Sequence, residues 1–338
     1  MIAPLTVSPL AVSLGDPAGI GPELIAEAWA RRVEENLPPF FVVGGAVLLA
    51  AAAQNRGLNV PLAQIQNPSE AGQCFGRALP VLGDDAYGYH PGQPDEAGAR
   101  LAFASLSEAT GLVSQGQASA LVTGPVAKSR LAQVGFTHPG QTEFVAESCG
   151  VAGSDAVMML AGPSLRTVPL TVHVAFTDVP KLVSQDLIVR KARTVAKALA
   201  RDFGIASPRI AIAALNPHAG EDGLFGDEDL RIVTPAIAAL QAEGINASGP
   251  HPADALFAPH SRGSFDVALC MYHDQALIPI KALDFDQGVN VTLGLPIIRT
   301  SPDHGTAFGI AGKNIANPGA MIAAIRMAGE CAMRRSAP

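Results

Sequence analysis

The sequence Val-Ala-Leu-Cys-Met-Tyr-His-Asp-Gln, residues 267–275, contains the pattern that decides the fold. Its apolar run is typical of a strand that is buried on both faces of a parallel sheet. The run ends abruptly at His273 and Asp274, two polar residues that follow the apolar stretch directly. In open parallel α/β sheets, ligands bind beyond the carboxyl ends of the strands. The stretch therefore predicts a buried strand that carries functional groups to one edge of a sheet.

The same alternation of apolar runs and helical patterns recurs on both sides of this stretch. Residues 56–94 are mixed and give no clear pattern. The remaining pattern predicts an α/β fold with a mainly parallel sheet that helices cover on both faces. The predicted strands are 9–14, 40–43, 118–122, 156–161, 167–175, 209–215 and 266–272, and the predicted helices are 22–32, 46–55, 95–113, 142–149, 186–202, 230–243 and 319–333.

Length and composition indicate an ordered protein with more than one core. A chain of 338 residues suggests two domains, and 48% hydrophobic residues argue against disorder. The net charge of −7 argues against nucleic-acid and anionic-membrane partners. No apolar run approaches the roughly 20 residues of a membrane helix, and no signal-type start is present. We therefore expect a cytoplasmic protein whose four cysteines, with no CxxC pair, are reduced core thiols.

Three histidines lie at or near the carboxyl ends of predicted strands, namely His173, His218 and His273. Carboxyl ends of parallel strands share one edge, so these imidazoles could converge on one divalent ion. Their spacing matches no local metal motif, and each also fits a hydrogen-bonded structural histidine, so both readings stay open. Asp254 and Asp274 could add oxygen ligands or orient an imidazole. The other histidines in Pro- and Gly-rich contexts are expected at the surface, namely His90, His138, His251 and His260.

Polar residues inside apolar stretches indicate a site for an anion. Lys281 and Arg299 each follow a run of Leu, Ile and Pro, and Asn290 lies between them. A lone Lys or Arg is usually a solvated surface charge. In apolar surroundings, however, a cation needs an anionic partner or a wet cleft. A phosphate or carboxylate ligand is therefore one interpretation of these residues.

Glycine-rich loops argue against the common dinucleotide fingerprint. The loop at residues 15–21, Gly-Asp-Pro-Ala-Gly-Ile-Gly, lacks the GxGxxG spacing. A Rossmann cofactor site is therefore disfavoured, and a nicotinamide cofactor would need a different loop.

Several segments in order carry a family resemblance. The chain resembles the 4-hydroxythreonine-4-phosphate dehydrogenase family along nearly its whole length. The tail also looks like the cofactor loop of isocitrate and isopropylmalate dehydrogenases, which bind NAD or NADP without that fingerprint. The matching segments are Gly15–Glu23, Thr123–Lys128, Gly140–Phe144, Ala214–Asp222, Gly249–Asp254, Tyr272–Gln275 and Gly288–Lys313.

The resemblance implies roles for individual residues. One divalent ion, Zn, Mg, Co or Mn, would be held by His173, His218 and His273, with ligands drawn from both partners of a dimer. Glutamine at 141 replaces the family's histidine, and it can donate a hydrogen bond but cannot carry charge. The substrate would contact Gln141, Thr142, Lys281, Asn290 and Arg299; the cofactor would contact His304, Gly305, Ala307, Gly312, Lys313 and Asn314; and the catalytic candidates are Lys281, Asp254 and Asp274.

The resemblance also implies an activity and an architecture. The expected reaction is NAD- or NADP-dependent oxidation of 4-phosphohydroxy-L-threonine in pyridoxal 5'-phosphate biosynthesis. The alternatives are a related dehydrogenase of phosphothreonate, phosphoerythronate or a cis-dihydrodiol, and a non-catalytic phosphate-binding protein. The expected fold has two α/β/α domains with an active-site cleft between them, like isopropylmalate dehydrogenase rather than a Rossmann protein. Residues 1–130 with 296–338 would bind the cofactor, and 131–295 would form the contact of a homodimer with shared sites.

Overall fold

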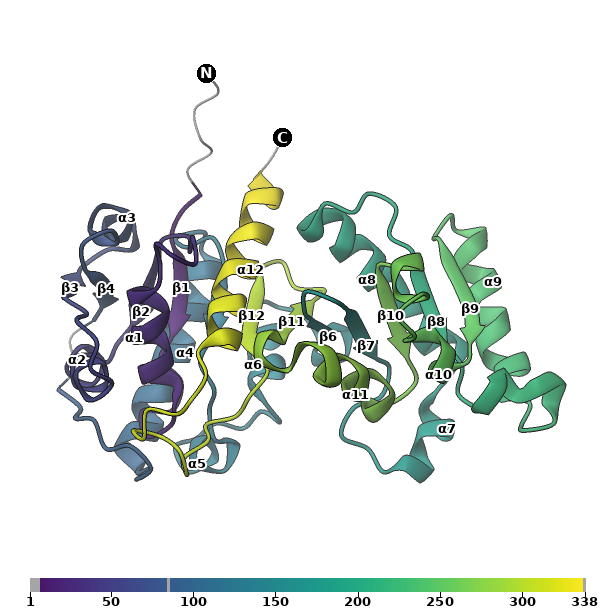
Figure 1. Cartoon of the computed structure of the whole chain (residues 1–338), viewed down its shortest axis with the longest axis horizontal. Helices are drawn as coiled ribbons and strands as arrows, with labels where there is room; N and C mark the ends of the chain where they lie inside the picture. The colour runs from purple at the N-terminus through teal and green to yellow at the C-terminus, as the bar shows by residue number, and fades with distance from the viewer. Residues whose placement is uncertain (1–6, 84–85, 337–338) are drawn as a thin grey trace, which may run out of the picture. The chain divides into compact units, whose positions relative to one another are not determined.

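The computed structural model describes residues 7–83 and 86–336, which group into two compact units (Figure 1). The first unit contains the described residues up to Ala156 together with those from Leu295 onward. The second unit is Val157–Gly294. The predicted domain boundaries, between residues 130 and 131 and between residues 295 and 296, stay a prediction.

The sheet of the first unit is parallel at every described pairing, in the order β3-β4-β2-β1-β5-β12. Every residue of β1, β2, β4, β5 and β12 is buried, which agrees with the apolar runs of a parallel sheet. The strands are β1 (Leu10–Ser13), β2 (Phe40–Val43), β3 (Leu62–Ile65), β4 (Leu79–Leu82), β5 (Leu121–Thr123) and β12 (Arg299–Pro302).

Helices of the first unit pack against these strands, as Figure 1 shows for the yellow α12 beside β12. Helix α4 packs against β1, and it begins where the Asp95 side chain accepts a hydrogen bond from the Gly98 amide at 2.7 Å. Such a cap satisfies a backbone donor that the helix itself leaves unpaired. The helices are α1 (Gly21–Ala30), α2 (Ala46–Asn55), α3 (Ala71–Cys74), α4 (Glu96–Ser114), α5 (Lys128–Ala132), α6 (Gln141–Ser148) and α12 (Gly319–Ser336).

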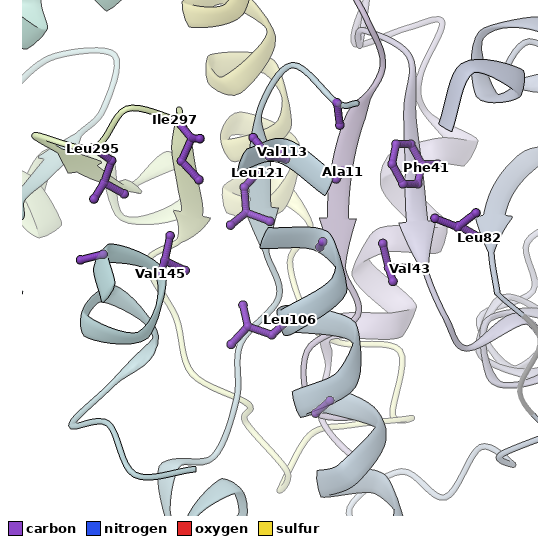
Figure 2. Packing of buried hydrophobic residues seen from close by; sticks show 14 of the residues in the cluster. Ala11, Phe41, Val43, Leu82, Leu106, Val113, Leu121, Val145, Leu295 and Ile297 are labelled. Atoms are coloured by element: carbon purple, nitrogen blue, oxygen red, sulfur yellow. The ribbon is translucent and has the colours of Figure 1, made fainter. Parts of the chain in front are cut away.

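A hydrophobic cluster joins β2 and β5 to α4 and α6 in this unit. Phe41 and Val43 alternate along β2 and, with Leu121 of β5, belong to the same cluster as Leu106 of α4 and Val145 of α6 (Figure 2). All five side chains are almost completely buried. The alternation along β2 therefore places one face of the sheet against these helices.

The sheet of the second unit is mixed, in the order β11-β6-β7-β10-β8-β9. Strands β7, β10, β8 and β9 are parallel, whereas β6 is antiparallel to both of its neighbours. The prediction of a mainly parallel sheet therefore holds for the strands that lead to the three histidines, and β6 is the antiparallel exception. The strands are β6 (Val157–Ala161), β7 (Arg166–Pro169), β8 (Ile210–Ala213), β9 (Ala247–His251), β10 (Val267–Cys270) and β11 (Val289–Leu293).

Helix α11 covers one face of that sheet through Ala276, Leu277 and Ile280, which join Ala268 of β10 in a buried cluster. Helix α8 begins where the Ser184 side chain caps the Leu187 amide, and it packs against α9. The helices are α7 (Val179–Leu182), α8 (Gln185–Phe203), α9 (Thr234–Ala242), α10 (Ala253–Leu256) and α11 (His273–Asp284).

Two expectations from composition can be compared with the described residues. The cysteines Cys74, Cys149, Cys270 and Cys331 are free thiols, two of them buried and two half-buried. In residues 7–83 and 86–336, no helix is both long enough and apolar enough to cross a membrane.

From the packing of the first unit we predict how much one core substitution lowers the free energy of unfolding. Replacing Phe41 with alanine removes a fully buried ring and leaves a cavity, so we expect a loss of about 3–5 kcal/mol in the free energy of unfolding. Val33→Ala is the control, because Val33 is 81% exposed. Urea denaturation followed by circular dichroism measures both variants. A loss below about 1 kcal/mol for Phe41→Ala would contradict the packing described here.

Candidate functional site

The three predicted metal-ligand histidines follow neighbouring parallel strands of the second unit. Strand β10 pairs with β7 on one side and with β8 on the other, and both pairings are parallel. His273 begins α11 directly after β10, His173 follows β7, and His218 follows β8. The carboxyl ends of all three strands therefore lie at one edge of the sheet, as expected from the sequence.

Two of these histidines lie together. The ring centroids of His173 and His273 are 5.8 Å apart, and both rings line a cavity of about 250 Å³. Nδ1 of His273 lies 2.7 Å from Oδ1 of Asp274, which orients this imidazole. Tyr272 and Phe176 close part of the same cavity, with their ring centroids 5.4 Å apart. The pair provides two imidazoles at an open, partly apolar cavity.

His218 is placed differently from this pair. Its ring contacts Phe225, with the centroids 6.0 Å apart. Within the part of the chain that the structure describes, no three His, Cys, Asp or Glu side chains are grouped so that they could hold a metal ion. The structure thus brings His218 to the same sheet edge as His173 and His273, but not into contact with them.

The backbone around His218 adopts an unusual left-handed turn. Residues 218–222 all have positive φ, with values of 53°, 56°, 79°, 42° and 54°, inside the short helix η4 (Pro217–Gly223). A left-handed conformation costs a residue other than glycine roughly 1–2 kcal/mol. His173 also has a positive φ of 52°. Strained backbone of this kind persists only where surrounding contacts hold it, and it clusters at functional sites.

A buried carboxylate holds the start of this turn. Asp229, which is 0% exposed, accepts hydrogen bonds from the amides of Leu215 at 2.7 Å and Asn216 at 2.9 Å. Asn216 also donates through Nδ2 to Oε2 of Glu228 at 2.8 Å. One carboxylate oxygen of Asp229 accepts from Leu215 and the other accepts from Asn216, the two residues that connect β8 to the His218 turn. These contacts offset part of the backbone strain.

Three other predicted site residues of the second unit lie on different elements and differ in burial. Asp254 is exposed on α10, and Lys281 is half-buried on α11, where its Nζ lies 5.7 Å from the centroid of the Phe285 ring. Asn290 of β11 has a buried side-chain oxygen that accepts no hydrogen bond from any described residue. A buried polar atom of this kind is costly unless a ligand or water pairs with it.

The first unit contains a buried arginine in the first position of strand β12. Arg299 of β12 is 4% exposed, and its Nη2 donates to Oγ1 of Thr123 at 2.7 Å and to Oε1 of Gln141 at 3.3 Å. Its Nη1 donates to Oγ1 of Thr142 at 3.4 Å. Gln141 in turn donates through Nε2 to the carbonyl of Gly124 at 3.0 Å. The structure therefore brings Arg299, Gln141 and Thr142 together, as the sequence resemblance implied.

The electrostatics of this cluster favour an anion. Burial lowers the pKa of Arg299 to about 10, an effect that the nearby Glu143 carboxylate opposes, so the guanidinium remains charged at neutral pH. Helix α6 begins at Gln141, and no side chain caps its first turn. Amides at a helix start carry partial positive charge, which adds to that of Arg299. A phosphate or carboxylate is the complementary ligand.

Two glycine loops meet beside this cluster. A Cβ on Gly15 would lie 2.7 Å from the Pro125 carbonyl, and a Cβ on Gly124 would lie 2.7 Å from the Gly15 amide. The amide of Asp16 donates to the Pro125 carbonyl at 2.8 Å. The loop at residues 15–21 therefore serves close backbone packing at the sheet edge, in agreement with its missing dinucleotide spacing.

The predicted cofactor loop is anchored to α1 and α2 of the same unit. Glu23, which is 0% exposed, accepts hydrogen bonds from the amide of Gly312 at 3.2 Å and from the hydroxyl of Tyr89 at 3.4 Å. Burial raises the pKa of Glu23, and the neighbouring guanidinium of Arg56, 3.6 Å away, opposes that rise. Asn314 donates through Nδ2 to the Asn55 carbonyl at 3.0 Å. These contacts hold one end of the loop.

The rest of that loop is more open. Lys313 is exposed, and Gly305 faces open space, since an added Cβ would meet nothing within 4 Å. His304 contacts the Gly305 carbonyl through Nδ1 at 3.0 Å. Ala307 has a positive φ of 47°. The loop is therefore anchored at one end by hydrogen bonds and exposes its backbone at Gly305, which suits contact with an extended ligand.

Two of the four histidines expected at the surface are half-buried, namely His138 and His251, whereas His90 and His260 are exposed. His251 does not lie in a surface loop: it ends strand β9 and is half-buried, with Nε2 2.9 Å from Oγ of Ser248. Its carbonyl accepts the amide of Ala214 at 2.8 Å, beside the end of β8. Prolines on both sides of His251 conceal this strand in the sequence, because proline is rare within sheets.

A family model and a curated relative both match most of the chain. A family model described as pyridoxal phosphate biosynthetic protein PdxA matches residues 36–328. The 4-hydroxythreonine-4-phosphate dehydrogenase of Erythrobacter litoralis is 62% identical over 328 residues, which cover 97% of this chain and 98% of the relative.

Solved structures agree with the sequence match. The crystal structure of 4-hydroxythreonine-4-phosphate dehydrogenase from Klebsiella pneumoniae superposes with a TM-score of 0.86 at 36% identity, covering 98% of this chain and all of that one (100%). A terephthalate 1,2-cis-dihydrodiol dehydrogenase from Burkholderia xenovorans is also similar, with a TM-score of 0.65 at 30% identity over 96% of this chain and 98% of that one.

The two backbone hydrogen bonds that Asp229 accepts at the start of the His218 turn lead to a prediction for Asp229→Asn. Asparagine keeps one acceptor oxygen but turns an NH2 group toward the second amide donor. We expect a loss of about 1.5–3 kcal/mol in stability, because hydrogen bonds to a charged group are lost. Amide hydrogen exchange of Leu215 and Asn216 should become faster. The control is Asp222→Asn, because Asp222 is exposed in the same turn. Equal hydrogen-exchange rates of Leu215 and Asn216 in both variants would contradict a role of Asp229 in holding this turn.

Proposed function

The chain belongs to the pyridoxal phosphate biosynthetic protein PdxA family, and on this premise we propose that it is a 4-hydroxythreonine-4-phosphate dehydrogenase. The supporting observation is the buried Arg299 cluster at the start of α6, which suits an anionic substrate. The substrate would be 4-phosphohydroxy-L-threonine, and the pathway would be pyridoxal 5'-phosphate biosynthesis.

The reaction has two stages. NAD or NADP accepts a hydride from C3 of the substrate while the C3 hydroxyl loses its proton to a base, which gives 2-amino-3-oxo-4-phosphohydroxybutanoate. This product is a β-keto acid, so it loses CO2 and takes up a proton to form 3-amino-2-oxopropyl phosphate. The protein has to hold the substrate against the nicotinamide, exclude water and accept the proton.

The chain's residues would divide these tasks. Arg299, Gln141 and Thr142 bind a substrate anion, and Lys281 and Asn290 are proposed as further substrate contacts. The buried oxygen of Asn290 needs a donor, which an ammonium or hydroxyl group of the substrate would provide. The base is proposed among Lys281, Asp254 and Asp274.

The proposed metal ligands are His173, His218 and His273. The 5.8 Å separation of two of the rings and the orientation of His273 by Asp274 suit imidazole coordination of Zn, Co or Mn, with Mg as a further candidate. When bound, a divalent ion supplies positive charge that acidifies the substrate hydroxyl and stabilises the negative charge that develops during decarboxylation.

The proposed cofactor contacts are His304, Gly305, Ala307, Gly312, Lys313 and Asn314. One end of this loop is held by hydrogen bonds and its backbone is exposed at Gly305, which supports contact with NAD or NADP. The two-domain layout with a cleft like that of isopropylmalate dehydrogenase, the homodimer with shared sites and the cytoplasmic location also remain proposals.

A second candidate is a related dehydrogenase with another substrate. Gln141 replaces the histidine of familiar family members, which changes a substrate contact that can carry charge to one that cannot. The similarity to a cis-dihydrodiol dehydrogenase points in the same direction. The candidate substrates are phosphothreonate, phosphoerythronate and a cis-dihydrodiol.

A substrate panel decides between these candidates. We expect NADH or NADPH formation with 4-phosphohydroxy-L-threonine, at a specificity constant at least about tenfold above every other compound, equivalent to about 1.4 kcal/mol. The panel contains phosphothreonate, phosphoerythronate and a terephthalate cis-dihydrodiol. Preference for any of these three would replace the proposed substrate, and absence of nicotinamide reduction with all of them would contradict a dehydrogenase.

The Arg299→Lys variant tests how the substrate anion is bound. Lysine keeps the charge but loses the planar fork that reaches Thr123, Gln141 and Thr142. We expect the specificity constant to fall by about 10–100-fold, equivalent to about 1.4–2.7 kcal/mol. The binding constant for the nicotinamide cofactor alone should change much less. An unchanged specificity constant would show that Arg299 does not contact the substrate.

A further inference from the structure

A buried carboxylate and a buried guanidinium hold residues 304–316, which contain the proposed cofactor loop, against helices α1 and α2. The Gly312 amide donates to Oε2 of Glu23 at 3.2 Å, and Nη2 of Arg56 donates to the Ala316 carbonyl at 2.6 Å. Glu23 lies in the first turn of α1, and Arg56 directly follows the last turn of α2. The two side chains therefore fix this segment at two points along its length.

The two charged groups depend on each other. Glu23 is 0% exposed, the side chain of Arg56 is 9% exposed, and Oε1 of Glu23 lies 3.6 Å from Nη1 of Arg56. Arg56 also pairs with Glu27, which lies one turn further along α1. Two carboxylates at this spacing on a helix repel each other, and the guanidinium offsets that repulsion. Removing one member of a buried ion pair leaves an uncompensated charge, so the group favours one arrangement.

Gly312 is held at both of its backbone polar groups. Its amide donates to Glu23, and its carbonyl accepts a hydrogen bond from Nδ2 of Asn55 at 3.0 Å. Its φ is +72°, and an added Cβ would lie 2.7 Å from Cγ of Pro91. Glycine adopts this left-handed conformation without a steric cost but has the largest freedom to leave it. The contacts from α1, α2 and Pro91 therefore select the observed conformation.

A further contact from the start of α1 lies nearer the beginning of the segment. The Ile20 amide donates to the Thr306 carbonyl at 3.0 Å, and Ile20 is the residue that precedes α1. Gly305 faces open space and Lys313 is exposed. Each of these two open residues is a direct neighbour in the chain of a residue whose backbone is bonded, Thr306 or Gly312. The groups that can meet a ligand are thus held by their neighbours.

A segment fixed in this way can bind a ligand with little loss of conformational entropy. Ordering a flexible segment on binding costs free energy, and a segment that is ordered beforehand avoids this cost. If only a fraction of the molecules has the competent conformation, the apparent dissociation constant rises in inverse proportion to that fraction. The ion pair of Glu23 and Arg56 therefore has a measurable consequence for ligand affinity.

We propose that Glu23 and Arg56 are positioning residues that hold residues 304–316 in the conformation that binds the nicotinamide cofactor, before the cofactor is bound. This inference rests on the proposed function, which assigns cofactor contacts to this loop. Both side chains are buried, so their substitution removes no direct contact with the cofactor.

Glu23→Gln in the full-length protein tests the carboxylate. Glutamine has nearly the same size and keeps an acceptor oxygen, but it lacks the charge that binds Arg56 and the Gly312 amide. We expect the Gly312 amide to exchange its hydrogen about tenfold faster in the absence of cofactor. The dissociation constants of NAD and NADP, measured by isothermal titration calorimetry, should rise about 3–10-fold.

Arg56→Lys tests the guanidinium without removing its charge. Lysine cannot reach Glu23, Glu27 and the Ala316 carbonyl together, because it lacks the planar fork of donors. We expect changes in hydrogen exchange and cofactor affinity in the same direction as for Glu23→Gln. The KM for the cofactor should rise, while kcat at saturating cofactor stays within about twofold of the parent value.

Glu35→Gln is the matched control. The side chain of Glu35 is partly buried and pairs with Arg326 of α12 in the same unit, and this ion pair includes no residue of the 304–316 segment. The variant should therefore keep the parent's exchange rate at Gly312 and its dissociation constants for NAD and NADP. If Glu23→Gln does not fold, as judged by circular dichroism, the comparison of Arg56→Lys with Glu35→Gln decides.

The outcomes separate the two proposals. A parent protein that binds neither NAD nor NADP would overturn the cofactor assignment of the proposed function, and this inference with it. A parent that binds a cofactor, with Glu23→Gln and Arg56→Lys binding it equally well, would overturn this inference alone. Weaker binding and faster exchange in these two variants, but not in Glu35→Gln, would support it.

Discussion

Buried hydrogen bonds at the ends of parallel strands are the constraint on which the candidate site depends. The sheet ladder of the second unit stops before its histidines begin, at Cys270 of β10. The side chains of Thr171 and Gln275 then link the three strand ends, and Asp229 holds the turn that follows β8. These bonds are made inside the protein, where an unpaired donor or acceptor would cost about 1–3 kcal/mol. These groups therefore stabilise the sheet edge from which the segments of His173, His218 and His273 lead.

The first unit uses a related arrangement with charged groups. Arg299 is buried among the hydroxyl and amide oxygens of Thr123, Gln141 and Thr142, and Glu23 is buried against Arg56 and the Gly312 amide. Burial shifts the pKa of Arg299 down and that of Glu23 up, because each charged form is less well solvated than in water. In the first unit these polar groups belong to strands and to helices, with Thr123 at the end of β5, Gln141 and Thr142 at the start of α6, and Glu23 in the first turn of α1.

Much of the fold was predictable from the sequence, because apolar runs and helix starts are local signals. Strand β10 with His273 directly after it, and α4 with its Asp95 cap, follow the predicted pattern closely. The direction of β6 was not predictable, because its apolar run resembles those of the parallel strands although β6 is antiparallel to both of its neighbours. The left-handed turn at 218–222 has only one glycine to indicate it. The bonds of Gln275 join residues far apart in the chain, which no local pattern reveals.

The most direct test of this account is the position of the metal itself. Crystals of the parent protein grown with Co²⁺ should be measured by anomalous diffraction at the cobalt absorption edge. The account predicts an anomalous peak about 2.0–2.1 Å from an imidazole nitrogen of each of His173, His218 and His273, the distance of coordination by histidine. A peak at other residues, or its absence at full Co²⁺ occupancy in solution, would contradict it.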